Sequence, residues 1–146
     1  MTVLTRTAFL MLLASASLFL TACSKPDPKV ALEAAVQELQ DRLEAKDSGA
    51  VLAMLDPLFR AQDEFDAEWA RKTMALVFLR YASVKIIAVS SNSYIDPPGS
   101  AIGVTEAQVV LTGAQGLIPE RVSPYSVQLR WKLEGSDWKL YDLRWE

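Results

Sequence analysis

The chain has 146 residues, of which 51% are hydrophobic and 23% are charged, and its formal net charge at pH 7 is −3. It contains no histidine and a single cysteine, which excludes imidazole catalysis, histidine metal ligands and an internal disulfide. The length predicts one domain, because compact domains most often have ~100 to 150 residues. A mildly acidic chain without clustered Lys and Arg is not expected to bind nucleic acid.

The first 22 residues have the layout of a secretory signal peptide. Arg6 is the only charged residue at their start, and the apolar run 8–20 follows it. This run is shorter than the ~20 apolar residues that a membrane-spanning helix needs, so a permanent transmembrane anchor is not expected.

The tetrapeptide Leu20-Thr21-Ala22-Cys23 resembles the lipobox of bacterial lipoproteins. The resemblance implies cleavage between Ala22 and Cys23, a diacylglyceryl thioether on Cys23 and an N-acyl chain on its amine. Each buried methylene contributes ~0.8 kcal/mol, so two or three acyl chains would hold the protein on a membrane. Since the thioether occupies the only thiol, Cys23 is not expected to be a nucleophile. In such lipoproteins, an aspartate directly after the cysteine favours retention in the inner membrane. Because Ser24 is at this position, the resemblance implies that the protein is anchored in the outer membrane and faces the periplasm.

The sequence thus divides into three parts. A lipoprotein signal peptide covers 1–22, a lipidated cysteine with a short tether covers 23–29, and one folded domain covers 30–146.

Two or three helices are predicted at the start of the domain. Apolar residues recur at helical spacing over 30–46, which indicates an amphipathic helix with one buried stripe. Ser48 can cap a short second helix, which Asp56-Pro57 ends. A third helix is predicted over 63–81, with acidic residues at its start and apolar side chains around much of its circumference.

Four strands are predicted after the helices, because the pattern becomes rich in β-branched and aromatic residues. Their ranges are 84–95, 101–112, 121–134 and 138–145. Short connections favour antiparallel neighbours. The predicted fold class is therefore α+β, with two or three helices packed on a curved four-stranded antiparallel sheet.

The last two strands define a candidate pocket. If Gly135 and Ser136 form a two-residue turn, the expected cross-strand pairs are Leu133 with Trp138, Trp131 with Leu140, Leu129 with Asp142 and Val127 with Arg144. This register places an acidic and a basic side chain under the helices. The candidate pocket residues are Trp69, Tyr125, Leu129, Trp131, Trp138, Asp142 and Arg144.

The opposite face of the last strand carries Tyr141, Leu143 and Trp145 in the same register. Three large apolar side chains on an outward face need cover. Two alternatives remain open: a homodimer or an envelope protein partner covers this candidate interface, or the stems of Arg130 and Lys132 shield it in a monomer.

The order of these elements resembles the nuclear transport factor 2-like (NTF2-like) superfamily, a cone-shaped α+β fold. Segments 34–55 and 131–140 carry the likeness, which extends over most of the mature chain. Enzymes of this superfamily commonly place Asp, His and Tyr side chains within the cone. No position here matches such a motif residue for residue, so the resemblance transfers no catalytic residue.

These observations favour a membrane-anchored lipoprotein whose domain binds a small apolar ligand or a protein partner without catalysis. The alternative is an enzyme of isomerase, dehydratase or hydrolase type that uses Asp142 in the cone as general base, with Tyr81, Tyr94 or Tyr125 as oxyanion donor. Arg144 on the same strand face would oppose this role by stabilising the charged carboxylate. No cofactor is expected and no metal, because without histidine or a free thiol only carboxylates remain as ligands.

Overall fold

The computed structural model describes residues 24–113, 116–117 and 124–146. The predicted signal peptide, lipobox and acylated Cys23 lie outside these ranges. Within them, no helix is long and apolar enough to cross a membrane.

Aspartate side chains set the starts of the helices. The helices are α2 (Pro28–Glu44), α3 (Ser48–Ala53) and α4 (Ala67–Arg80). Asp27 accepts a hydrogen bond from the Lys29 N–H at 2.8 Å and Asp66 accepts one from the Trp69 N–H at 3.0 Å. Such a side chain satisfies an otherwise unpaired N–H and so fixes where the helix begins. As a result, α2 begins two residues before its expected start at 30, and α4 begins four residues after its expected start at 63. Asp47 caps α3, where Ser48 was expected.

The strands form one curved, mixed sheet in the order β1-β6-β5-β3-β2. They are β1 (Leu55–Ala61), β2 (Val84–Ile95), β3 (Ile102–Gly113), β5 (Tyr125–Glu134) and β6 (Asp137–Trp145), and the two-residue β4 (Gly116–Leu117) pairs with β3. The α+β class is confirmed, and so are the four expected strands. The four expected strands pair antiparallel as predicted, whereas the strand count was too low, because β1 extends the sheet by a parallel pairing with β6. Asp56-Pro57 ends the helical run as expected but enters an edge strand, where proline is tolerated.

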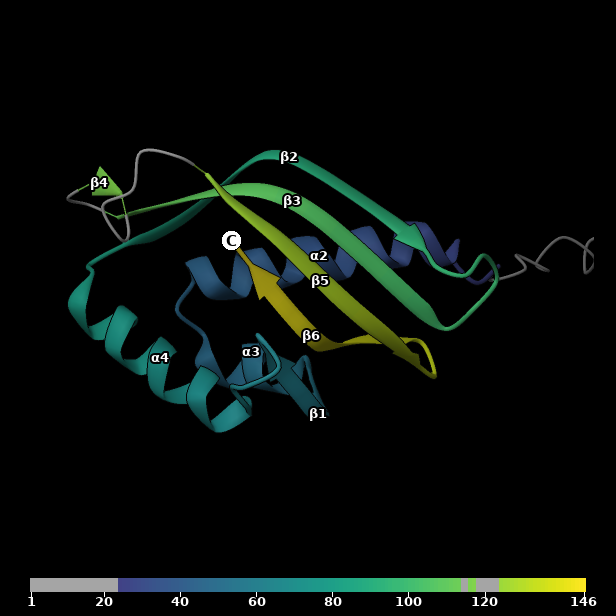
Figure 1. The fold of residues 1–146 in the computed structure, drawn as a ribbon, viewed down its shortest axis with the longest axis horizontal. Coiled ribbons are helices and arrows are strands. Elements are labelled where there is room, and N and C mark those ends of the chain that lie inside the picture. The colour runs from purple at the N-terminus through teal and green to yellow at the C-terminus, as the bar shows by residue number, and fades with distance from the viewer. Residues whose placement is uncertain (1–23, 114–115, 118–123) are drawn as a thin grey trace, which may run out of the picture.

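Figure 1 shows α2 running behind β2, β3 and β5, with α3, α4 and β1 grouped beside β6. Two side chains of α2 fasten it to the edge strand β2: Gln40 Nε2 donates to the Ile86 carbonyl at 2.9 Å, and Glu44 Oε1 accepts from the Ile86 N–H at 2.8 Å. Lys85 Nζ lies 3.0 Å from the other Glu44 oxygen. The Ile86 N–H and then Lys85 hold the pKa of Glu44 below its usual value. These bonds keep the helix over the sheet.

A β-bulge in β6 decides which of its side chains face the helices. The turn at Gly135 and Ser136 gives the expected pairs of Leu133 with Trp138 and of Trp131 with Leu140. The register then shifts, so that Arg130 pairs with Asp142, Leu129 with Leu143 and Val127 with Trp145. The expected pairs Leu129 with Asp142 and Val127 with Arg144 are therefore wrong. One extra residue, Tyr141, reverses the alternation of every side chain that follows it.

Candidate functional site

An apolar cavity of about 680 Å³ lies between the helices and the inner face of the sheet. Its volume falls within the ~300–1,000 Å³ typical of small-molecule sites. Apolar side chains from almost every element of the fold form its wall, among them Val36, Leu39, Leu43, Phe59, Met74, Ile86, Val109, Leu111, Val127 and Leu140. Ala88 and Ser91 also line it and are exposed, so the cavity opens along β2.

Two stacked tryptophan rings, Trp69 and Trp145, form one side of this cavity, and Phe65 stacks on Trp69. The ring centroids of Phe65 and Trp69 are 4.8 Å apart, and those of Trp69 and Trp145 are 5.9 Å apart with planes inclined by 9°. Such pairs contribute about 0.5–1.5 kcal/mol beyond the area that they bury. Trp145 was expected on the outward face and is here part of the cavity wall, as is Leu143.

The cavity has few polar groups. Ser93 Oγ and Thr105 Oγ1 lie 2.9 Å apart, and both residues are buried. Glu33 is the only charged residue among the described residues that line the cavity, and it forms an ion pair with Lys29 at 3.6 Å. In the part of the chain that the structure describes, no group of three or more Cys, Asp or Glu side chains is placed to hold a metal ion. The lining is suited to holding an apolar molecule.

The structure divides the predicted pocket residues into three groups. Trp69, Tyr125 and Leu129 line the cavity. Trp131 and Trp138 lie in the core at 0% and 5% exposure, and their Nε1 atoms have no hydrogen-bond partner among the described residues. The third group, Asp142 and Arg144, is on the outer face of β6.

The Asp142 carboxylate does not enter the cavity. It pairs across the sheet with Arg130, and its Oδ2 accepts a hydrogen bond from Arg144 Nε at 3.0 Å. Arg144 Nη2 also lies 2.5 Å from Asp63 Oδ1. The prediction that places Asp142 in the cone is wrong, because the bulge at Tyr141 turns it to the other side of the sheet.

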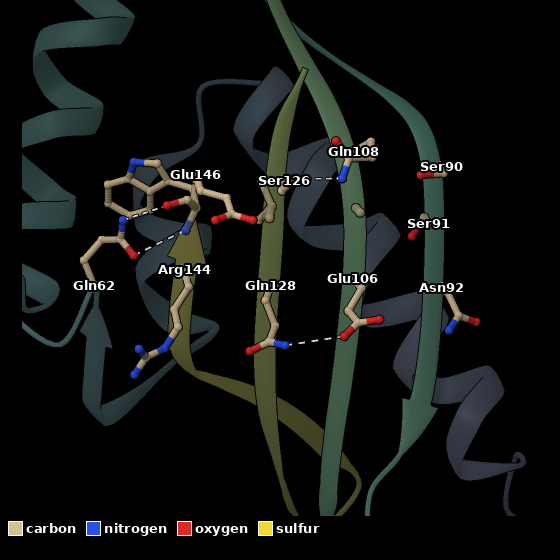
Figure 2. A pocket seen from close by; sticks show the side chains of 13 residues that line it. Gln62, Ser90, Ser91, Asn92, Glu106, Gln108, Ser126, Gln128, Arg144 and Glu146 are labelled. Atoms are coloured by element: carbon tan, nitrogen blue, oxygen red, sulfur yellow. Dashed lines mark hydrogen bonds between the residues drawn. The ribbon is translucent and has the colours of Figure 1, made fainter. Parts of the chain in front are cut away.

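A second hollow, a polar groove of about 700 Å³, lies on the outer face of the sheet. Figure 2 shows its amide, hydroxyl and charged side chains on strands that have the helices behind them. Gln108 Nε2 donates to Ser126 Oγ at 2.8 Å, and Gln128 Nε2 lies 3.5 Å from Glu106 Oε1. Tyr94 donates its hydroxyl proton to the same Glu106 oxygen at 3.2 Å. The sequence pattern does not indicate this groove, because polar residues on an outer strand face normally face water.

The expected outward patch of Tyr141, Leu143 and Trp145 is not formed. Of the three, Tyr141 is the one that does not line the cavity, and Arg130 Cζ lies 5.9 Å and Lys132 Nζ 4.6 Å from its ring centroid. This arrangement agrees with the alternative in which the stems of these two cations shield the ring.

No protein-family model matches the sequence, and no curated protein matches it. Among solved structures, Bd1075 of Bdellovibrio bacteriovorus aligns with a TM-score of 0.68 at 11% identity over 79% of this chain, which corresponds to 40% of Bd1075. An NTF2-like protein of Cytophaga hutchinsonii aligns at 0.63 and 10% identity, over 82% of this chain and 97% of its own. A proposed dehydratase of the NTF2-like family from Streptomyces avermitilis aligns at 0.65 and 9% identity, over 80% and 93%. The described domain therefore has the NTF2-like fold.

Proposed function

We propose that the chain is a lipid-anchored protein of the bacterial cell envelope whose NTF2-like domain binds a small apolar ligand in the cavity under α2 and α4. The observation that carries this proposal is the cavity itself: about 680 Å³, lined mainly by apolar side chains and stacked tryptophans. A dry wall of this kind favours an apolar occupant, because moving apolar surface out of water is favourable at roughly 25 cal/mol per Å².

The short tether between the anchor and the domain supports the same function. Only residues 24–27 separate Cys23 from the first residue of α2, Pro28. Four extended residues span at most about 14 Å. An acylated Cys23 would therefore keep the domain close to the outer-membrane surface, where apolar molecules are concentrated.

Occupation of the cavity is tested by filling it. Ala70 lines the cavity from α4, whereas Ala75 on the same helix is exposed. In the purified full-length chain, Ala70→Phe should weaken binding of the neutral fluorescent probe N-phenyl-1-naphthylamine by at least about tenfold, since an added ring takes the ligand's space. Ala75→Phe should leave this affinity unchanged. Equal affinities in the two variants would place the probe elsewhere.

The anchor is tested separately in cells of the host bacterium. Cys23→Ala should abolish incorporation of labelled palmitate and release the domain from the membrane fraction. Continued labelling of the variant would contradict the lipoprotein assignment without affecting the ligand site.

A further inference from the structure

Among the described residues, the buried hydroxyl pair of the apolar cavity has one proton without an acceptor. Ser93 and Thr105 face each other on the paired strands β2 and β3, and both line the cavity. Each hydroxyl has one proton to donate, and the 2.9 Å contact between the two oxygens uses one of them. No other hydrogen bond joins either hydroxyl to a residue within 24–113, 116–117 or 124–146.

The two side chains differ in how far they can be reached from the cavity. Either hydroxyl can be the donor in their contact, and both residues line the cavity. Ser93 is the more accessible of the two, with 5% exposure against 0% for Thr105, so a bound molecule reaches the Ser93 hydroxyl more readily. A buried donor without an acceptor is costly, and native structures rarely leave one unpaired.

The charges around the cavity restrict what the acceptor can be. No Lys or Arg is among its lining residues in the described ranges, and the one charged side chain there, Glu33, is an anion. A buried carboxylate or phosphate would have no cation to pair with and would be strongly disfavoured. A carbonyl oxygen accepts the same hydrogen bond without bringing a charge.

We propose that Ser93 is the recognition residue of this cavity and that its ligand is a neutral, mainly apolar molecule with one carbonyl group, of the acyl ester or ketone class. The carbonyl oxygen accepts the Ser93 hydroxyl proton, Thr105 holds that hydroxyl in place, and the hydrocarbon part fills the apolar wall. This inference rests on the proposed function, because it names the chemistry of the same ligand.

Ser90 provides a matched control on the same strand. Its side chain is exposed and borders the outer groove, and it is not among the residues that line the cavity. Because water already satisfies an exposed hydroxyl, Ser90→Ala should leave ligand affinity unchanged.

The test uses the purified full-length chain and displacement of N-phenyl-1-naphthylamine by methyl decanoate, undecane and sodium decanoate at pH 8. Ser93→Ala should weaken methyl decanoate binding about fivefold to tenfold, the loss of one net hydrogen bond, and undecane binding less than about twofold. Methyl decanoate should bind the unmodified protein more tightly than decanoate does. Decanoate should gain affinity when the pH is lowered through its own pKa.

The outcomes separate this inference from the proposed function. If all three probes bind but Ser93→Ala weakens methyl decanoate and undecane equally, or if decanoate binds as tightly as its methyl ester at pH 8, the recognition by Ser93 is overturned and the apolar site remains. If no probe binds the unmodified protein, the proposed function fails and this inference with it. The comparison of ester with carboxylate needs no variant, so it holds even if Ser93→Ala does not fold.

Discussion

The two faces of one sheet carry hollows of similar volume and different chemistry. The inner cavity, about 680 Å³, is mainly apolar and contains one buried hydroxyl pair, whereas most residues that line the outer groove, about 700 Å³, have amide, hydroxyl or charged side chains. In the groove, Glu106 and Arg144 already have partners of their own. The polar side chains of the outer groove thus largely bind one another, whereas the inner cavity presents an apolar wall, which is what the proposed ligand site requires.

The largest effect should come from removing an inner-face ring. Trp131→Ala should lower the free energy of unfolding by about 3–5 kcal/mol, because the side chain is fully buried and its loss leaves a cavity. Gln128→Ala, on the outer face of the same strand, should change it by no more than about 0.5 kcal/mol. Urea unfolding followed by circular dichroism measures both. Similar losses in the two variants would remove the distinction between the faces.

An intermediate effect is expected where α2 meets the closed end of the inner face. A Cβ on Gly103 would lie 2.7 Å from a methyl carbon of the buried Leu32 and 3.3 Å from the Trp138 ring. Gly103→Ala should therefore cost about 1–3 kcal/mol of stability. The same change at Gly49, in α3, meets only ordinary contacts and should stabilise by about 0.5–1 kcal/mol. Thermal melts of both variants should shift in opposite directions; a neutral Gly103→Ala would mean that Leu32 is not packed there.

The smallest effect concerns the bonds that keep the helix over the inner face. The lowered pKa of Glu44 means that its contribution to stability is present above the usual value of 4.5 and is lost as the pH falls through the lower folded pKa. Glu44→Gln should cost roughly 1 kcal/mol at pH 7, one net hydrogen bond. The difference in unfolding free energy between the variant and the unmodified protein should then become smaller towards pH 3. Urea midpoints across this range test the sign, and a difference that stays constant would contradict it.

Local sequence patterns predicted much of the fold. β2 has the expected bounds, and Gly135-Ser136 forms the expected two-residue turn. β1 was missed because Asp56-Pro57 indicates a break, and its partner β6 is far along the chain: Leu55 pairs with Leu140. Pairings over such separations depend on tertiary packing, which short-range periodicity does not contain.

The site was predicted less completely, for a related reason. Trp69, Tyr125 and Leu129 line the cavity, but Asp142 and Arg144 were assigned to it by extending the hairpin register without a bulge. The sequence does contain a signal for the bulge. Leu143 and Trp145 are apolar, whereas Asp142 and Arg144 are charged, and placing the apolar pair on the buried face requires a shift in register. The Ser93–Thr105 pair carried no such signal, because small polar residues are common in exposed strands.

The bulge at Tyr141 also affects how this chain is compared with its structural relatives. At about 10% identity, residue-by-residue alignment of β6 depends on where a gap is placed. For a relative that lacks the bulge, an alignment that passes through position 141 without a gap would equate Leu143 and Trp145 with residues on the opposite face of its sheet. Superposed coordinates, rather than sequence columns, are therefore the basis on which cavity-facing positions can be transferred to or from this strand. A single-residue deletion at the bulge would exchange the faces of the sheet on which the following side chains lie.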